Sequence, residues 1–217
     1  MYNISSTCQI PSLSSIYNIY FPENYIGYFI EVGAYDGESF SNTSCLADNG
    51  WSGIYIEPVY NNYIACKERH KKNKVVVENL SIGSKEGEIT IYCDRFLSTT
   101  DKNKASLFSE EIFKGSQFSE SSCNQLRLDT LMKKYETPIN LDLLVIDVEG
   151  SEFDVLKSFN INYWKPKMLI IELIDNHKDF AKFESLVKES QDIREYILNS
   201  NYIEIYKDNI NTIFIKK

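Results

Sequence analysis

The sequence has few of the features that mark membrane, secreted or nucleic-acid-binding proteins. No apolar run approaches the roughly 20 residues that a membrane-spanning helix needs, and residues 1–6 are polar, without a signal-peptide pattern. Basic residues number 23 against 31 acidic ones, which gives a formal net charge of -8. Because binding to a phosphate backbone requires clustered Lys and Arg, this balance argues against a nucleic-acid partner.

Cysteine is present, but not in a pattern that builds a framework. The five cysteines are odd in number and widely spaced, and no C-x-x-C occurs. This usage is typical of reduced thiols in a cytoplasmic protein, and it argues against a disulfide frame or a zinc site.

The glycine motifs that bind phosphates are absent or incomplete. No G-x-x-x-x-G-K-[ST] occurs, which excludes a P-loop. The stretch Y-F-I-E-V-G-A-Y-D-G at 28–37 has Gly33 and Gly37 but lacks two glycines of the dinucleotide fingerprint. Glu31 and Asp36 would also repel a pyrophosphate. They favour a ligand with an amino group and a sulfonium, and S-adenosylmethionine has both without a phosphate.

The same stretch predicts the corner around which the fold is organised. The apolar run 29–32 ends at Gly33, a pattern that indicates a buried strand leading into a tight loop. A helix is expected over 39–49, with its N-terminus offering free N–H groups to that loop.

Strands and helices alternate along the rest of the chain. Strands are expected over 53–57, 75–78, 88–93, 141–146 and 168–173, and a terminal hairpin over 202–206 and 212–215. Helices are expected over 60–72, 129–135, 152–159 and 180–199. This order predicts an α/β fold, doubly wound around a mostly parallel sheet, as a single domain over 1–217. Residues 1–27 would form an N-terminal cap, and 95–123, which follows neither period, an insertion or mobile lid.

Acidic residues gather where the predicted strands end. In parallel sheets ligands bind beyond the carboxyl ends of the strands, so these side chains would share one rim. They would repel one another there unless they bind hydroxyls, amines, a metal or a cationic ligand. The residues are Glu31, Asp36, Glu57, Asp147, Glu149 and Glu172. Glu57 follows Gly37 by about 20 residues, the spacing at which a carboxylate grips a ribose.

Five segments resemble, in order, the FkbM family of class I, Rossmann-like S-adenosylmethionine-dependent methyltransferases. They are F-I-E-V-G-A-Y-D-G with S-N-T, G-W-S-G-I-Y-I-E-P, R-L-D-T-L, I-D-V-E-G-S-E and I-I-E-L, which span about 29–173. The resemblance implies a seven-stranded methyltransferase sheet with its last strand antiparallel. It also implies O-methylation of a hydroxyl on a sugar or glycan precursor.

The resemblance further assigns roles around the cofactor. Glu31, Gly33, Asp36 and Ser39 would line its methionine part, and Glu57 would bind its ribose. Asn79 and Ser81, just past the third strand, would lie near its adenine.

Two catalytic routes remain open from the residues alone. In the first, Asp147 takes the proton of the acceptor hydroxyl, with Glu149 beside it and His177 as a further candidate base. In the second, Asp147 and Glu172 bind a divalent cation, Mg²⁺ or Mn²⁺, that lowers the pKa of the hydroxyl. Asp147 could instead cap the helix that follows it.

Other functions also stay open at this stage. One alternative is a nicotinamide-dependent oxidoreductase, and another is a non-catalytic Rossmann-like module that pairs with a glycosyltransferase. For the enzyme, the expected partner is a small-molecule or glycan acceptor with a free hydroxyl, and a homodimer is a further possibility.

Overall fold

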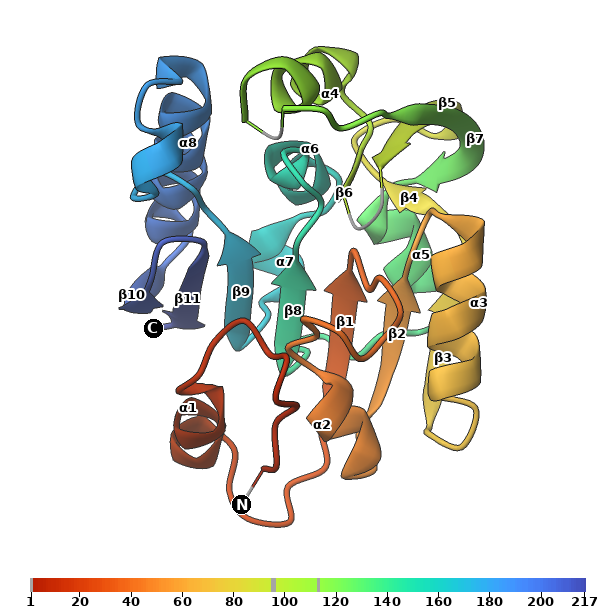
Figure 1. Ribbon diagram of the computed structural model, residues 1–217. Helices are drawn as coiled ribbons and strands as arrows, with labels where there is room; N and C mark the ends of the chain where they lie inside the picture. The colour runs from red at the N-terminus through yellow and green to blue at the C-terminus, as the bar shows by residue number, and fades with distance from the viewer. Residues whose placement is uncertain (1, 95–96, 113) are drawn as a thin grey trace.

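The computed structural model describes residues 2–94, 97–112 and 114–217 and is built on a seven-stranded sheet (Figure 1). The strand order is β10-β11-β9-β8-β1-β2-β3. The bounds are β1 (Tyr28–Val32), β2 (Ser52–Ile56), β3 (Val75–Glu78), β8 (Leu143–Ile146), β9 (Met168–Glu172), β10 (Tyr202–Lys207) and β11 (Asn211–Lys216).

Most of this sheet is parallel, as the sequence predicts. The pairs β1–β2, β2–β3, β1–β8 and β8–β9 are parallel, whereas β11 runs antiparallel to both β9 and β10. The expected terminal hairpin is therefore confirmed. The carboxyl ends of five parallel strands meet at one edge, which we call the carboxyl edge.

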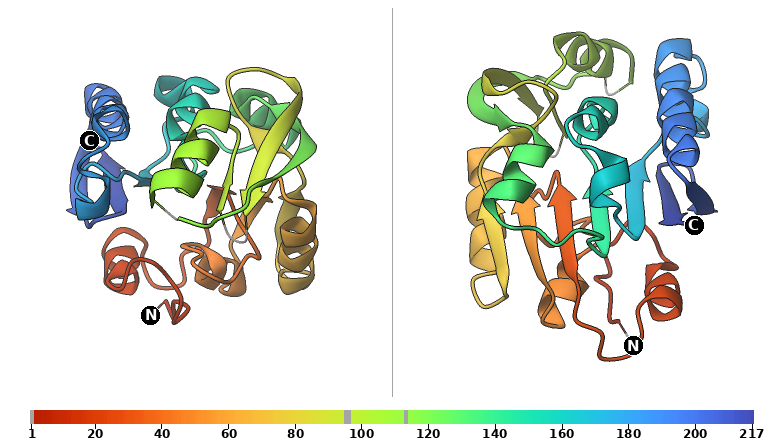
Figure 2. Two further views of the ribbon diagram at one scale, coloured as in Figure 1. Left: turned by 45° about the horizontal axis from the view of Figure 1, so that its top comes forward. Right: turned by 180° about the vertical axis from the view of Figure 1, so that it is seen from behind.

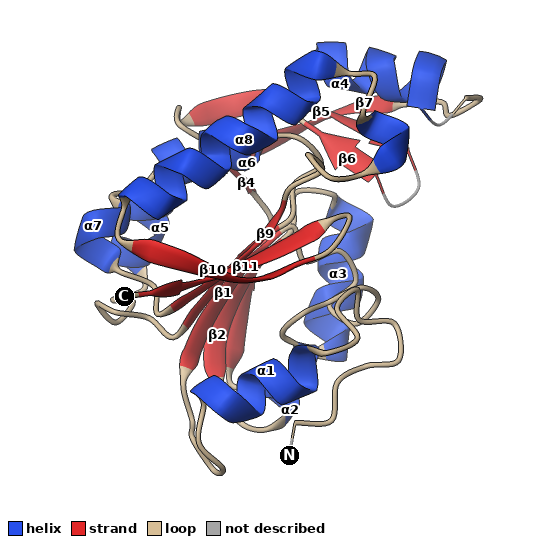
Figure 3. Ribbon diagram, turned by 90° about the vertical axis from the view of Figure 1, so that its left-hand side faces the viewer, coloured by secondary structure: helices blue, strands red, loops and turns tan. Residues whose placement is uncertain are grey.

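Helices cover both faces of the sheet (Figure 3). One face carries α1 (Leu13–Tyr20), α2 (Ser44–Asp48) and α3 (Tyr60–Arg69), and the other carries α5 (Leu128–Lys134), α6 (Glu152–Lys157), α7 (Ile161–Trp164) and α8 (Glu184–Asn199). Alternate strand residues enter two separate cores. In β1, Ile30 and Val32 pack on the α5–α8 side and Phe29 on the α1–α3 side. Burial on both faces explains why the strands read as continuous apolar runs.

A second, smaller sheet lies above the carboxyl edge, where its yellow-to-green ribbon is seen in both views of Figure 2. Its order is β4-β7-β5-β6, formed by β4 (Ser81–Ile82), β5 (Gly87–Asp94), β6 (Leu97–Thr99) and β7 (Ser119–Leu126). α4 (Lys102–Leu107) and the π-helix η1 (Phe108–Ile112) follow β6.

The predicted insertion 95–123 therefore contains regular structure, apart from positions 95, 96 and 113, which lie outside the described residues. The sequence pattern did not show β7 because its residues are polar and mostly exposed, so no apolar alternation marks it. Its backbone pairs with β5 over seven positions. The role of this segment as a lid stays a prediction.

The helix expected over 39–49 is wrong in its first half. α2 begins only at Ser44, because the residues before it bind the carboxylate of Glu31 on β1. Ser and Thr hydroxyls that find such partners draw the backbone away from helical geometry. A helix N-terminus directly at the Gly33 loop is therefore absent from the described structure.

The other differences are smaller. The helix expected over 180–199 begins only at Glu184, as α8, and the short 3-10 helix η2 (Lys178–Phe180) precedes it. The N-terminal cap contains α1. Leu13 and Tyr17 of α1 are fully buried, so this segment forms part of the core. Among the described residues no helix is long and apolar enough to cross a membrane, and all five cysteines are free.

Candidate functional site

A cavity of about 880 Å³ lies at the carboxyl edge and is lined by the loops that follow β1, β2, β8 and β9. A volume of this size is typical of a small-molecule binding site. Eight of the residues predicted from the sequence line it: Glu31, Gly33, Ser39, Glu57, Asp147, Glu149, Glu172 and His177. Asp36, Asn79 and Ser81 do not line this cavity.

The loops after β1 and β8 touch at Gly33. This glycine has a φ of +89°, and a Cβ built on it would lie 1.7 Å from the carbonyl oxygen of Asp147. Its N–H and that of Ala34 both donate to the carbonyl of Ile56, at 3.0 Å each. Only glycine allows this contact, which fixes the start of the loop against the ends of β2 and β8.

Glu57 ties the loop after β1 to the end of β2. Its side chain is 3% exposed, Oε2 accepts the N–H of Tyr35 at 2.9 Å, and Oε1 accepts the N–H of Val59 at 2.8 Å. Burial raises the pKa of this carboxyl to about 7.

Asn79 and Ser81 lie past β3 and make contacts within the protein. Asn79 donates to the backbone carbonyls of Glu57 and Pro58, and the hydroxyl of Ser81 donates to Oε1 of Gln125. Both hold the surroundings of the site, and their contact with adenine stays a prediction.

Two further carboxylates shape the first loop. Glu31 accepts hydrogen bonds from the hydroxyls of Ser41 and Thr43 at 3.0 and 2.5 Å, and its burial raises its pKa to about 7. Asp36 accepts from the N–H of Ser39 at 2.7 Å and from its hydroxyl at 2.8 Å. The sequence-based assignment of these residues to the methionine part of the cofactor therefore competes with a structural role.

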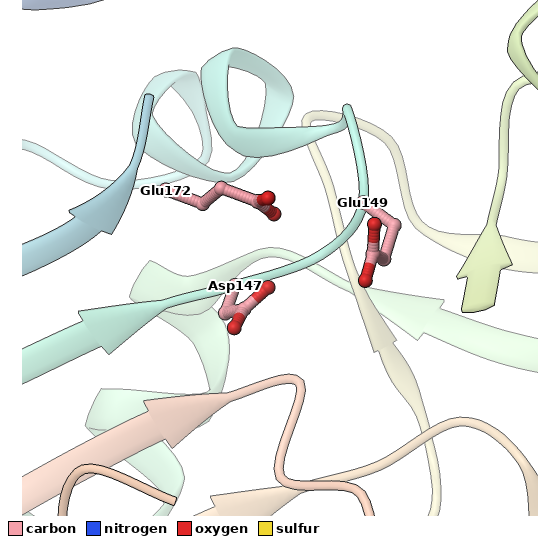
Figure 4. Close-up of side chains that lie close together, drawn as sticks. All are labelled: Asp147, Glu149 and Glu172. Carbon is pink, nitrogen blue, oxygen red and sulfur yellow. The ribbon is translucent and has the colours of Figure 1, made fainter. Parts of the chain in front are cut away.

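Asp147, Glu149 and Glu172 converge at the ends of β8 and β9 to form what we call the carboxylate trio (Figure 4). One oxygen from each lies within 4.8 Å of the other two. Burial raises all three pKa values, and the neighbouring negative charges raise those of Glu149 and Glu172 further. Only Asp147 has side-chain hydrogen bonds that oppose this shift within the trio, from Glu172 and Gln9. Within the trio, Asp147 is therefore the member whose surroundings best support a negative charge.

The turn after β8 places the trio. Glu149 has a φ of +53° and Gly150 a φ of +97°, and Glu152 holds the turn by accepting the N–H groups of Val148 and Gly150 at 3.2 and 2.9 Å. α6 begins at Glu152, with Ser151 preceding it, so Asp147 does not cap that helix. The left-handed conformation of Glu149, which is uncommon for a residue with a side chain, directs its carboxyl toward the other two.

His177 also lines the cavity, but its geometry suits a donor better than a base. Its Nδ1 accepts the N–H of Asp179 at 3.2 Å. With Nδ1 engaged in this way, Nε2 is the ring nitrogen left to face a ligand as a hydrogen-bond donor. Its predicted catalytic role stays a prediction.

Two residues of the site have no signal in the sequence. Lys104 of α4 lines the cavity, donates to the carbonyl of Gly150 and pairs with Glu189 of α8 at 2.6 Å. Gln9, from the N-terminal segment, lines the cavity beside Asp147. Both come from segments without apolar periodicity and meet the site only in three dimensions.

The raised pKa values predict an unusual dependence of stability on pH. The folded pKa of Glu31, Glu57 and Glu152 is about 7, above the ordinary 4.5, so the native state holds protons that the unfolded chain has released. Their contribution is fully present below about pH 4.5 and is lost as the pH rises through about 7. His70, whose pKa burial lowers, acts in the opposite direction but is one group.

We therefore expect the urea midpoint of the ligand-free protein to fall between about pH 5.5 and about pH 7.5. Fluorescence-monitored unfolding across this range measures it. A midpoint that rises with pH would contradict the assignment of raised pKa values to these carboxyls.

Comparisons with known proteins identify the family and the fold. A sequence model of the methyltransferase FkbM domain matches residues 31–204. A candidate caffeoyl-CoA O-methyltransferase from Staphylococcus aureus superposes with a TM-score of 0.55 and 13% identity, covering 96% of this chain and 84% of that one. An O-methyltransferase from Bacillus cereus in complex with SAH gives 0.52 and 14%, covering 99% and 85%. At these identities the two structures show the fold alone. No curated protein matches the sequence.

Proposed function

The chain belongs to the FkbM methyltransferase family, and we propose that it methylates a hydroxyl of a sugar or glycan precursor, with S-adenosylmethionine as the methyl donor. Family membership argues against the two alternatives, an oxidoreductase and a non-catalytic module. The observation that carries the choice of a hydroxyl is Asp147, a half-buried carboxylate in a wall of the cavity whose charge is supported by two neighbouring side chains. A glycosyltransferase or homodimer partner stays a prediction.

The residues at the β1–β2 end of the cavity fit S-adenosylmethionine. Glu57 receives one backbone N–H on each carboxylate oxygen and has Asn62 as a side-chain neighbour, which leaves acceptor capacity for a ribose hydroxyl. The carboxylates along the lining favour a ligand that carries an ammonium and a sulfonium. When bound, the cofactor supplies an electrophilic methyl group.

At the β8–β9 end, Asp147 supplies what a sugar hydroxyl lacks. Such a hydroxyl is a weak nucleophile and loses its proton as it attacks, so a carboxylate placed beside it acts as a general base. The pKa values of Glu149 and Glu172 are raised well above the usual range of a glutamate, whereas Asp147 has partners that support its charge, so Asp147 is the proton acceptor that we propose. Phe108 and Phe180 also line the cavity and offer apolar surface to the faces of a sugar ring.

A divalent cation is a second way to stabilise the trio, and we propose it as the alternative to protons. Three carboxylate oxygens within 4.8 Å of one another fit a single Mg²⁺ or Mn²⁺, for which oxygen ligands are preferred. Glu149 would then be a third ligand beside Asp147 and Glu172. In this arrangement the cation would hold the acceptor hydroxyl and lower its pKa.

Calorimetric titration with S-adenosylhomocysteine tests the cofactor site. We expect micromolar binding, and Glu57→Ala should weaken it by about 30-fold because the ribose loses a buried acceptor and two backbone N–H groups lose theirs. Glu57→Gln separates these effects, since its amide keeps one acceptor oxygen. Glu78→Ala, which removes a carboxylate from the neighbouring strand β3 outside the cavity, is the matched control. Wild-type affinity in Glu57→Ala would remove this residue from the site.

The same titration, repeated with Mg²⁺ or Mn²⁺, tests the cation. A cation bound by the trio should change the affinity for S-adenosylhomocysteine in the wild type and not in Glu172→Gln. An effect that survives this substitution would place the cation elsewhere.

Methyl transfer from S-adenosylmethionine to a panel of methyl glycosides, followed by mass spectrometry, tests the acceptor class. A mass increase of one methyl group on a glycoside supports it. If the panel stays unmodified while S-adenosylhomocysteine binds, the carbohydrate acceptor is wrong and the methyltransferase assignment stands.

A further inference from the structure

Gln9 contacts the catalytic carboxylate from outside the region that defines the family. The FkbM match begins at residue 31, and Gln9 precedes it by more than 20 residues. Its side chain nevertheless lines the cavity together with Asp147 and is one of the two groups that support the charge of this carboxylate. A carboxylate accepts hydrogen bonds, so it is the amide nitrogen of Gln9 that can support the charge of Asp147.

This orientation leaves the other half of the amide unused. Oε1 of Gln9 is shielded from solvent and has no hydrogen-bond partner among the residues that the structure describes. The same holds for Oε2 of Glu172, the second partner of Asp147. A buried oxygen without a donor is costly, so both atoms fit a bound ligand that supplies O–H or N–H groups.

The backbone around Gln9 holds the side chain in place. The hydroxyl of Thr7 donates to the carbonyl of Glu38 at 3.3 Å, and the thiol of Cys8 donates to Oδ1 of Asn42 at 3.6 Å. Ile10 is fully buried in the core beneath α1 and α2. Anchors on both sides of Gln9 hold its backbone at the edge of the cavity.

We infer that Gln9 is a specificity-determining residue that selects acceptors with a second hydrogen-bond donor next to the reacting hydroxyl, as in a vicinal diol. The reacting hydroxyl faces Asp147, and its neighbour donates to Oε1 of Gln9. This inference rests on the proposed transfer to a carbohydrate hydroxyl. It also excludes acceptors with a phosphate or carboxylate at that position, because the oxygens of Gln9 and Glu172 would repel an anion.

The test pairs an enzyme variant with a changed acceptor. The probe is the methyl glycoside that the wild type methylates fastest, together with the deoxy analogues that each lack one hydroxyl beside the methylated one. In the wild type, one of these deletions should lower kcat/KM about tenfold, the worth of one hydrogen bond. In Gln9→Leu the KM for the intact glycoside should be about tenfold higher. Deleting the same hydroxyl from the acceptor should then lower kcat/KM of this variant by less than about twofold.

Two controls keep the outcome decisive. Gln191→Leu makes the same chemical change on the exposed side of α8 and should behave as the wild type. Affinity for S-adenosylhomocysteine should be unchanged in Gln9→Leu.

Three results would overturn the inference. An equal deletion penalty in Gln9→Leu and wild type would show that the oxygen does not meet the acceptor. A tenfold loss of S-adenosylhomocysteine affinity would assign Gln9 to the cofactor instead. Absence of transfer to every glycoside, with cofactor binding intact, would reject the carbohydrate acceptor and this inference with it.

Discussion

Gly33→Ala is expected to remove cofactor binding and most of the stability of the fold. The new Cβ would lie 1.7 Å from the carbonyl oxygen of Asp147, far inside van der Waals contact, and neither atom belongs to a flexible side chain. Separating them requires the loop after β1 to leave the ends of β2 and β8. Alanine is also strained at a φ of +89°. We therefore expect the unfolding free energy to fall by more than about 3 kcal/mol, which is a large share of its typical value.

Gly115→Ala is the matched control for this substitution. Gly115 has a φ of +96°, close to that of Gly33, but a Cβ there meets nothing within 4 Å. Gly115→Ala should lower the unfolding free energy by about 1–2 kcal/mol, through the backbone strain alone, and S-adenosylhomocysteine should still bind. Urea unfolding and calorimetry measure both quantities. Equal losses in the two variants would show that the contact with Asp147 has no part in the effect.

Asp147→Asn is expected to lower kcat by about 10²–10⁴ while leaving S-adenosylhomocysteine affinity within about threefold. The amide has the size of the carboxyl group but cannot take a proton. The pH profile provides a second readout. Because burial raises the pKa of Asp147, the acid limb of the wild-type rate should lie above the range of an exposed aspartate, and this limb should disappear in the variant.

Asp192→Asn tests whether loss of a carboxylate alone has this effect. Asp192 lies on α8, has a side chain that is 42% exposed, and pairs with Lys188 at 2.6 Å. Its rate and pH profile should match those of the wild type. If Asp147→Asn kept its turnover, the base would have to be sought elsewhere on the cavity wall, or the cation would perform the activation.

The sequence predicted the residues that lie where a strand becomes a loop. Gly33, Glu57 and Asp147 each follow a short apolar run, and the period and length of that run determine both the strand and its end. In a parallel sheet this is enough to bring the three to one edge. The seven strands and the terminal hairpin follow from the same patterns, together with the family resemblance.

Residues that reach the site across long sequence separations could not be predicted in this way. Lys104 meets a partner 85 residues away in Glu189, and no local pattern records that contact. The wrong half of the helix at 39–49 has the same origin. The local sequence there is compatible with a helix. The buried carboxylate of Glu31, which lies ten residues before Ser41, instead accepts hydrogen bonds from Ser41, Asn42 and Thr43.

The small sheet above the carboxyl edge has a consequence for how such a chain can diversify. Residues 81–126 lie between β3 and α5, and α5 leads into β8 beside β1. None of these residues belongs to the seven-stranded sheet, so they form one long insertion between its strands β3 and β8. The entropy of closing a flexible loop grows only with the logarithm of its length, by about 0.6 kcal/mol for each doubling. Changing the length of this insertion therefore alters the loop-closure entropy of the fold only slightly. The wall that it adds to the cavity can change with the acceptor while the seven-stranded framework remains the same.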